Sequence, residues 1–381
     1  MSLSTLAQLG ATGLLAALLP LAMVWVAADP NKYRKLVWLS VFLTFDLILF
    51  GAFTRLADAG LGCPDWPGCY GLANPFQAHE AISAAHALLP SGPVSVFKAW
   101  VEMIHRYLAM GIGVLIVALM AQAWRQWQRG RRAEFSPWLP TALFLFVCLQ
   151  GAFGAWTVTL KLQPVIVTIH LLLGMGLLAL LAWLGGRQDH AVAPPVTASS
   201  MPAGMGKIRV LALGAAVLLL LQIALGGWVS TNYATLACSD FPLCDGRLVP
   251  AMDFEHGFTL WRALGKTAAG HYLPFPALTA IHWVHRSFAV LVLAGIGYTA
   301  WRASRYPGLR PTARRIGLVL ALQAGSGIAT IFLNYPLAIA VLHNGGAALL
   351  VLLLTMLNYR AKFQYEAERT APPSSPARYL P

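Results

Sequence analysis

Charged residues are scarce in this chain. Only 11% of its 381 residues are charged and 14 are acidic, whereas 58% are hydrophobic. A soluble domain carries about 25% charged residues, so the composition excludes an ordinary soluble protein and indicates one that crosses a membrane several times. The net charge of +13 does not indicate nucleic-acid binding, because the basic residues fall in short clusters between long apolar runs.

A transmembrane helix needs about 20 mostly apolar residues. Nine apolar runs in this chain are long enough to form one. They cover residues 10–28, 36–57, 98–123, 137–159, 165–185, 208–231, 277–301, 316–334 and 337–358. Alternating connections place 19 of the 27 lysines and arginines on one side and 6 on the other, with Arg106 and Arg286 inside spans. The positive-inside rule then predicts a cytoplasmic C-terminus and a periplasmic N-terminus.

The leader before the first run lacks lysine and arginine. Residues 1–10 therefore do not have the basic segment of a secretory signal peptide, and no small-residue cleavage site follows cleanly. They also lack the arginine-rich, amphipathic character of a mitochondrial transit peptide. We expect residues 1–30 to form an additional, retained transmembrane helix in a bacterial inner membrane.

Cysteine is equally rare, with five in the chain. Four form two C-x5-C pairs, Cys63 with Cys69 and Cys238 with Cys244, and both pairs lie in loops on the outer side. An oxidising compartment favours disulfides there, and a metal site is the weaker alternative because each loop offers only two thiols. Cys148 lies inside a span and is expected to be a small buried hydrophobe.

The two cysteine loops are copies of one motif, C-x-D-[W/F]-P-x-C, and a His-Arg pair follows each copy. Each half of the chain also has the same order of spans, a long outer loop and a basic inner loop. We predict an all-α polytopic membrane protein with two pseudo-symmetric four-helix bundles. The bundles would comprise residues 31–186 and 208–358, joined by a flexible cytoplasmic linker at 187–207 and followed by a cytoplasmic tail at 359–381.

Histidines lie inside the spans, where ionisable groups are costly and usually functional. His105 and His170 in the first half, and His285 and His343 in the second, all lie roughly 8–12 Å below the outer boundary, counted at 1.5 Å per residue. Two facing imidazoles at one level suit a six-coordinate haem, whereas zinc would need further ligands that do not converge in either half. The pattern predicts one haem site in each half.

Three arginines lie near the outer ends of the spans: Arg55, Arg106 and Arg286. A guanidinium pairs well with carboxylates, so we expect these residues to bind haem propionates. The alternative is that they extend to the membrane interface.

The two halves differ at one position, where Glu102 aligns with His282. The i,i+3 spacing puts Glu102 on the same helix face as His105, and a buried carboxylate can stabilise positive charge or move a proton. We therefore expect the first half to do chemistry and the second to hold a fixed redox cofactor. A structural ion pair with Arg106 is the alternative for Glu102. A second intramembrane carboxylate, Asp46, fits a proton path or a helix–helix hydrogen bond equally well.

Together these residues resemble the haem A synthase family. The resemblance covers residues 36–358 and rests on Gly51-Ala52-Phe53-Thr54-Arg55-Leu56, Gly60-Leu61, Trp66-Pro67, Glu102-x-x-His105-Arg106, His170, His285 and His343. It implies a fold of two four-helix bundles. It also implies an oxidoreductase that converts a methyl group of haem O to a formyl group, giving haem A for cytochrome oxidase assembly.

The resemblance further implies roles for individual residues. His105 and His170 would ligate the substrate haem, His285 and His343 would ligate a permanent haem b, and Glu102 would be the essential acid. The family's cysteine pair falls on Cys63 and Cys69, and Cys238 and Cys244 form a second pair. The resemblance also implies an association with the enzyme that makes haem O and with cytochrome oxidase assembly factors. The sequence leaves a homo-oligomer open.

Two other functions explain the histidines: a bis-histidine membrane cytochrome that transfers electrons from quinol, and a haem carrier. The cytochrome would leave the cysteine pairs and the single Glu102 unexplained. A transporter fits least, because the spans lack paired helices broken by glycine or proline. Pigment extraction separates the first two from a synthase, because only a synthase makes a formyl-bearing haem appear.

Overall fold

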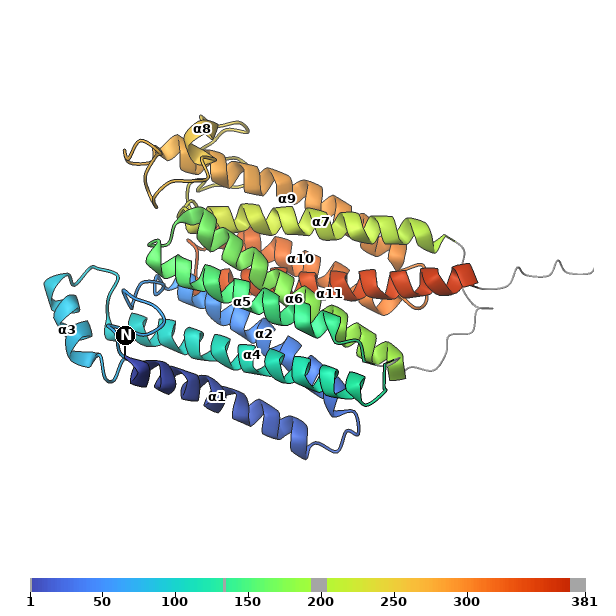
Figure 1. Cartoon of the computed structure of the whole chain (residues 1–381). Coiled ribbons are helices and arrows are strands. Elements are labelled where there is room, and N and C mark those ends of the chain that lie inside the picture. Colours follow the sequence, from blue (N-terminus) through green and yellow to red (C-terminus); the bar gives the residue numbers. More distant parts are fainter. Residues whose placement is uncertain (1, 133–134, 193–203, 371–381) are drawn as a thin grey trace, which may run out of the picture.

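The computed structural model describes residues 2–132, 135–192 and 204–370. Within these ranges the chain is helical and has no strand, and nine helices are long and apolar enough to cross a membrane, as predicted (Figure 1). These helices are α1 (Leu3–Val26), α2 (Lys32–Leu56), α4 (Val96–Gln128), α5 (Trp138–Thr159), α6 (Pro164–Val192), α7 (Met205–Thr231), α9 (Phe275–Ala303), α10 (Arg310–Phe332) and α11 (Leu337–Thr370). Two short helices, α3 (His79–Leu88) and α8 (Phe254–Gly257), lie in the long loops.

The long helices are the expected form of apolar segments in lipid, where each backbone polar group must be satisfied within the segment. Side-chain oxygens cap the first turns of three of them. Ser2, Asn31 and Ser95 accept hydrogen bonds from backbone N–H groups at the starts of α1, α2 and α4.

Both ends of the linker predicted at residues 187–207 are helical in the structure, because α6 continues to residue 192 and α7 begins at Met205. The end of α6 is held because Asp189 accepts hydrogen bonds from Arg34 Nε at 2.6 Å and Trp38 Nε1 at 3.0 Å, which ties it to α2. Residues 193–203 of the predicted linker, and residues 371–381 of the predicted tail, lie outside the described residues.

The helices of each half pack in a closed ring. Helix α2 contacts α4 and α6, and α5 contacts the same two helices; α7, α9, α10 and α11 pack pairwise in the corresponding way. Between the halves, α6 contacts α7 and α11, and α2 contacts α11. Helix α1 lies outside the rings against α4, where a Cβ on Gly13 would lie 2.9 Å from Met110 Cβ. The bare backbone of Gly13 therefore permits this close packing.

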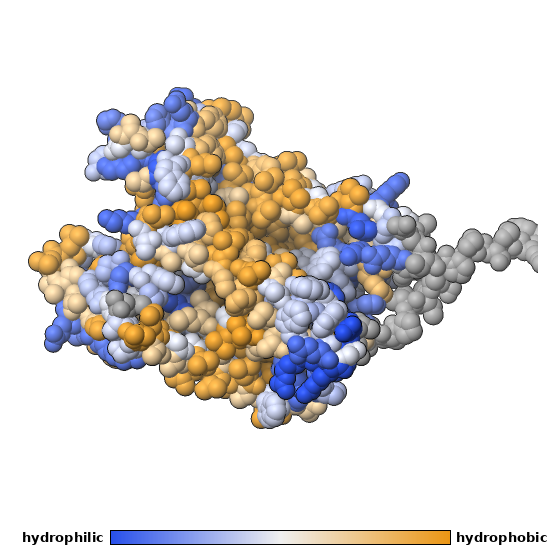
Figure 2. Space-filling view, in the orientation of Figure 1, coloured by the Kyte–Doolittle hydropathy of each residue, from blue (hydrophilic) through white to orange (hydrophobic). Residues whose placement is uncertain are grey.

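The surface carries an apolar band with hydrophilic ends (Figure 2). Large apolar side chains on α1, α7 and α10 are exposed, including Leu15, Leu213 and Leu322. This distribution fits a multi-pass membrane protein. The expectation for Cys148 was wrong, because its side chain is exposed on the outer side of α5.

The cysteine loops lie together at one end of the molecule, called here the loop end; the opposite end, where α6 stops and α7 begins, is called the linker end (Figure 1). The predicted disulfides, Cys63–Cys69 and Cys238–Cys244, are confirmed. In each loop an aspartate accepts two backbone N–H bonds: Asp65 from residues 70 and 71, and Asp240 from residues 245 and 246. Both loops also have a cis peptide bond before the proline.

Candidate functional site

The two predicted histidines of each half lie on opposite helices of its ring, His105 on α4 and His170 on α6, and His285 on α9 and His343 on α11. That the rings of each pair face one another across the ring of helices stays a prediction. All four side chains are only partly buried although they lie among the helices. Space therefore remains beside the rings, as a ligand between them requires.

A glycine on a neighbouring helix faces each of the four histidine rings. A Cβ on the glycine would lie 2.9 to 3.2 Å from the ring's Cε1 in every case, closer than almost any real Cβ contact. The pairs are Gly51 with His105, Gly154 with His170, Gly226 with His285, and Gly327 with His343. The missing side chains are what allow the imidazoles to lie between the helices.

Three of these glycines are preceded, four residues earlier, by a glutamine on the same helix face. The Nε2 group of Gln150 donates to the carbonyl of His170 at 3.1 Å, and that of Gln222 donates to the carbonyl of His285 at 3.2 Å. Gln323 Nε2 lies 3.3 Å from His343 Nε2. The corresponding position on α2 is Leu47, so His105 has no such glutamine.

The rings of the two halves are held differently. His285 Nδ1 lies 3.1 Å from Gln222 Nε2, and His343 Nδ1 lies 2.9 Å from Ser326 Oγ. In contrast, the Nδ1 atoms of His105 and His170 are buried without a hydrogen-bond partner among the described residues. The rings of the second pair are therefore held at Nδ1 by side chains, whereas those of the first pair are not held there by any described residue.

Glu102 lies buried beneath the first cysteine loop, with 4% of its surface exposed. Its Oε2 accepts the backbone N–H of Cys63 at 2.9 Å, and its Oε1 forms an ion pair with Arg106. The ion pair that sequence reasoning gave as the structural alternative is thus present. In the second half the N–H of Cys238 donates to His282 Nδ1 at 3.2 Å. Both halves use this position to hold a loop, but only the first carries a carboxylate.

The arginines next to the histidines bind the same loops. Arg106 is buried and donates from Nη1 to three loop carbonyls, those of residues 65, 67 and 68, at 2.6 to 3.3 Å. Arg286 donates from Nη2 to the carbonyls of residues 242 and 243, and its buried Nη1 finds no hydrogen-bond partner in the part of the chain that the structure describes. The guanidinium of Arg106 therefore binds the protein's own loop. Propionate binding by Arg106 and Arg286 stays a prediction.

Arg55 crosses from the first half to the second. Its Nη2 donates to the Ser230 carbonyl at 2.6 Å, its guanidinium lies 4.2 Å from the centre of the Tyr233 ring, and it approaches Asp58 to 3.7 Å. The Tyr233 hydroxyl donates to Asp58. Burial raises the pKa of Tyr233, which keeps this donor protonated. Asp46 lies elsewhere, exposed near the middle of α2.

A family model for cytochrome oxidase assembly proteins matches residues 34–355. This chain belongs to that family. The matched range contains every histidine, arginine and cysteine discussed above, together with Glu102, and helix α1 lies before it.

Curated relatives in the cytochrome oxidase assembly family carry the name haem A synthase. The protein from Shewanella oneidensis is 38% identical over 332 residues, which cover 85% of this chain and 96% of that protein. The protein from Sinorhizobium medicae is 31% identical over 356 residues, which cover 87% of this chain and 90% of that protein. The protein from Caulobacter sp. is 30% identical over 348 residues, which cover 86% of this chain and 95% of that protein. The likeness therefore extends over nearly the whole length of each relative.

Proposed function

We propose that this protein is a haem A synthase, a membrane oxidoreductase that converts a methyl group of haem O to the formyl group of haem A. The relatives of that name support the assignment over most of the chain. The observation that carries it within the structure is the pair of histidine sites, of which only one has a carboxylate in the position of Glu102. A plain electron-transfer cytochrome has no need for that difference.

The two halves, residues 31–186 and 208–358, are in this proposal pseudo-symmetric bundles related by an axis along the membrane normal. Contacts at their seam support it. Arg55 bonds Ser230 and Tyr233 bonds Asp58, and the partners in both pairs are 175 residues apart in the sequence. A two-fold axis brings equivalent residues of two units into contact where they meet it.

His105 and His170 would hold the substrate haem, and His285 and His343 a resident haem b. The ring contacts support this division. A substrate must enter and leave, which suits the unpartnered Nδ1 atoms of the first pair, whereas a permanent cofactor suits histidines fixed by Gln222 and Ser326.

The loop end would face the periplasm of a bacterial inner membrane, and the linker end the cytoplasm. Two features support this orientation: the excess of lysine and arginine at the linker end, and the disulfides at the loop end, which persist in oxidising compartments. The proposed function also implies contact with the enzyme that supplies haem O and with cytochrome oxidase assembly factors. A homo-oligomer stays open.

In the reaction, the haem group supplies the redox chemistry, and the chain supplies orientation and charge. His105 and His170 would hold the substrate haem between α4 and α6. Glu102 lies one helical turn from His105 and forms an ion pair with Arg106. It would stabilise positive charge that develops during oxidation, or accept at a carboxylate oxygen the proton released from the methyl group.

The Glu102→Gln variant tests this role. The amide keeps the shape of the side chain and can still accept the N–H of Cys63, so we expect the variant to retain bound haem while haem A formation falls by about 100-fold or more, the usual range for loss of acid–base catalysis. Extracting pigments from cells with the variant measures the formyl-bearing haem. Glu80→Gln, on the exposed helix α3, is the matched control and should form haem A normally. Normal haem A in the Glu102 variant would remove this residue from the mechanism.

A further inference from the structure

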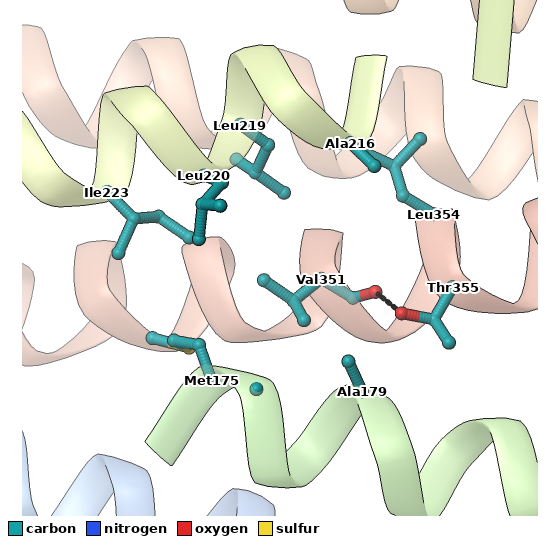
Figure 3. Close-up of a pocket in the computed structure, with 10 residues that line it drawn as sticks. Met175, Ala179, Ala216, Leu219, Leu220, Ile223, Val351, Leu354 and Thr355 are labelled. Carbon is teal, nitrogen blue, oxygen red and sulfur yellow. Dashed lines mark hydrogen bonds between the residues drawn. The ribbon is translucent and has the colours of Figure 1, made fainter. Parts of the chain in front are cut away.

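A groove opens between the two halves, and its inner end begins five residues beyond His170 on α6. Its inner part is a hollow of about 160 Å³ between α6, α7 and α11, and Figure 3 shows its lining. The lining is almost wholly apolar: Met175, Gly176, Ala179, Ala216, Leu219, Leu220, Ile223, Val351 and Leu354, with Thr355 as the one hydroxyl. This chemistry suits a hydrocarbon chain.

The groove widens towards the linker end into a mouth of about 560 Å³. The mouth shares Ala179, Ala216 and Thr355 with the inner hollow, so the two are continuous. It adds two cations, Arg209 at the start of α7 and Lys362 near the end of α11, and its lining contains no acidic residue. Lys362 lies 3.8 Å from the exposed Glu366, while Arg209 lies over the Tyr365 ring at 4.7 Å.

Two neutral polar side chains that line the groove, Asn358 and Thr355, are already bonded within the protein. The Asn358 amide donates to the carbonyls of Ala212 and Leu354, both at 2.9 Å. The Thr355 hydroxyl donates to the Val351 carbonyl at 2.7 Å, the dashed line in Figure 3. What the mouth offers a ligand is therefore positive charge, which selects an anionic headgroup over a neutral one.

The length of the groove matches one leaflet of a bilayer. Arg209 and Ile223 are fourteen residues apart on α7, which corresponds to roughly 21 Å along the helix. Half of the hydrocarbon core measures about 15 Å, and the remaining length reaches the headgroup level. The cations thus lie at headgroup depth, and the apolar hollow lies where acyl chains do.

We propose that this groove binds one anionic phospholipid, with its phosphate at Arg209 and Lys362 and an acyl chain in the hollow beside Ala216. The lipid would fill the seam between the halves in the leaflet at the linker end. Basic side chains at this depth attract anionic headgroups. No histidine of either pair lines the groove, so the proposal stands or falls independently of the proposed function.

Native mass spectrometry of the purified full-length protein tests it, with phosphatidylglycerol and phosphatidylcholine titrated separately. The wild type should retain one phosphatidylglycerol per chain in preference to phosphatidylcholine. The double variant Arg209→Gln/Lys362→Gln should bind phosphatidylglycerol about 25-fold more weakly, at about fivefold per cation. The Ala216→Phe side chain would fill the hollow and should weaken the binding of both lipids.

The matched control is Arg314→Gln/Arg315→Gln, two exposed cations at the same end but outside the groove. It should bind phosphatidylglycerol within about twofold of the wild type. Haem content and elution volume, measured on the same samples, identify any variant that has misfolded. Equal retention of the two lipids by the wild type would overturn the proposal. So would unchanged phosphatidylglycerol binding in the folded double variant, or a quinone or free isoprenoid found in place of the lipid.

Discussion

At the residue scale, Arg106 holds both a carboxylate and a loop, which its position beside a histidine did not predict. Its guanidinium joins Glu102 to three carbonyls of the first cysteine loop, so one buried cation fixes both the loop and the carboxylate. Sequence reasoning placed the residue near the outer surface and its carboxylate neighbour on the same helix. It could not find the loop contacts, because they depend on how residues 63–69 fold back over α4.

Replacing Arg106 by Gln should destabilise the protein strongly. It leaves Glu102 buried without its cation, and removing one partner of a buried pair costs about 3–5 kcal/mol. The Arg286→Gln variant should lose clearly less stability, because Arg286 is less buried and donates to only two carbonyls. Thermal unfolding of the two purified variants beside the wild type measures the difference. Equal losses would contradict the larger role assigned to Arg106 and its ion pair with Glu102.

A pH effect is expected at Asp240 in the second loop. Backbone N–H groups of Gly246 and Asp245 hold the pKa of this carboxyl below its usual value. A lowered pKa means that the stabilisation is complete above the unfolded value of about 3.9 and is lost as the pH falls through the folded value. Hydrogen exchange at the Gly246 amide should therefore lose protection at acidic pH. In Asp240→Asn, protection should be weaker at neutral pH and vary less with acidity; an unchanged profile would contradict this account.

At the scale of elements, hydropathy was sufficient to predict nine spanning helices, because a membrane requires long apolar segments. It could not predict their ends, since α4, α6 and α11 continue past the apolar region into water-facing turns. The loop helices α3 and α8 were also missed, because short helices outside the membrane leave no long apolar run. The positions of the glutamines and glycines against the histidines could not be predicted either, because these contacts are made between helices.

The glycines opposite the histidines give a sharp test at this scale. Gly327→Leu should displace the His343 ring, because even a Cβ there would lie 3.1 Å from Cε1. We expect the variant to lose haem b from the second half while added haem O still binds in the first. Gly325 lies two residues away on α10, and a Cβ added there meets nothing within 4 Å. The Gly325→Leu variant should therefore keep haem b and still bind haem O. Pyridine haemochrome spectra of purified protein measure the outcome, and full haem b in Gly327→Leu would refute the role of this glycine.

At the scale of the whole molecule, the duplicated sequence motif corresponds to duplicated packing. The same pairwise helix contacts occur in each half, and the seam contacts join residues at equal distances in the sequence. The two halves differ in two features on which the proposed function relies: the carboxylate of Glu102, and the Nδ1 hydrogen bonds that hold only the second pair of rings. One fold could thus hold a substrate in one half and a cofactor in the other.

The most direct test is the haem content of the purified protein with His105 and His285 replaced separately by alanine. The wild type should carry haem b and bind added haem O. His285→Ala should lose haem b and still bind haem O, whereas His105→Ala should keep haem b and fail to bind haem O. A colourless wild type with no capacity for haem, or replacements that leave both haems in place, would contradict the account of two histidine sites.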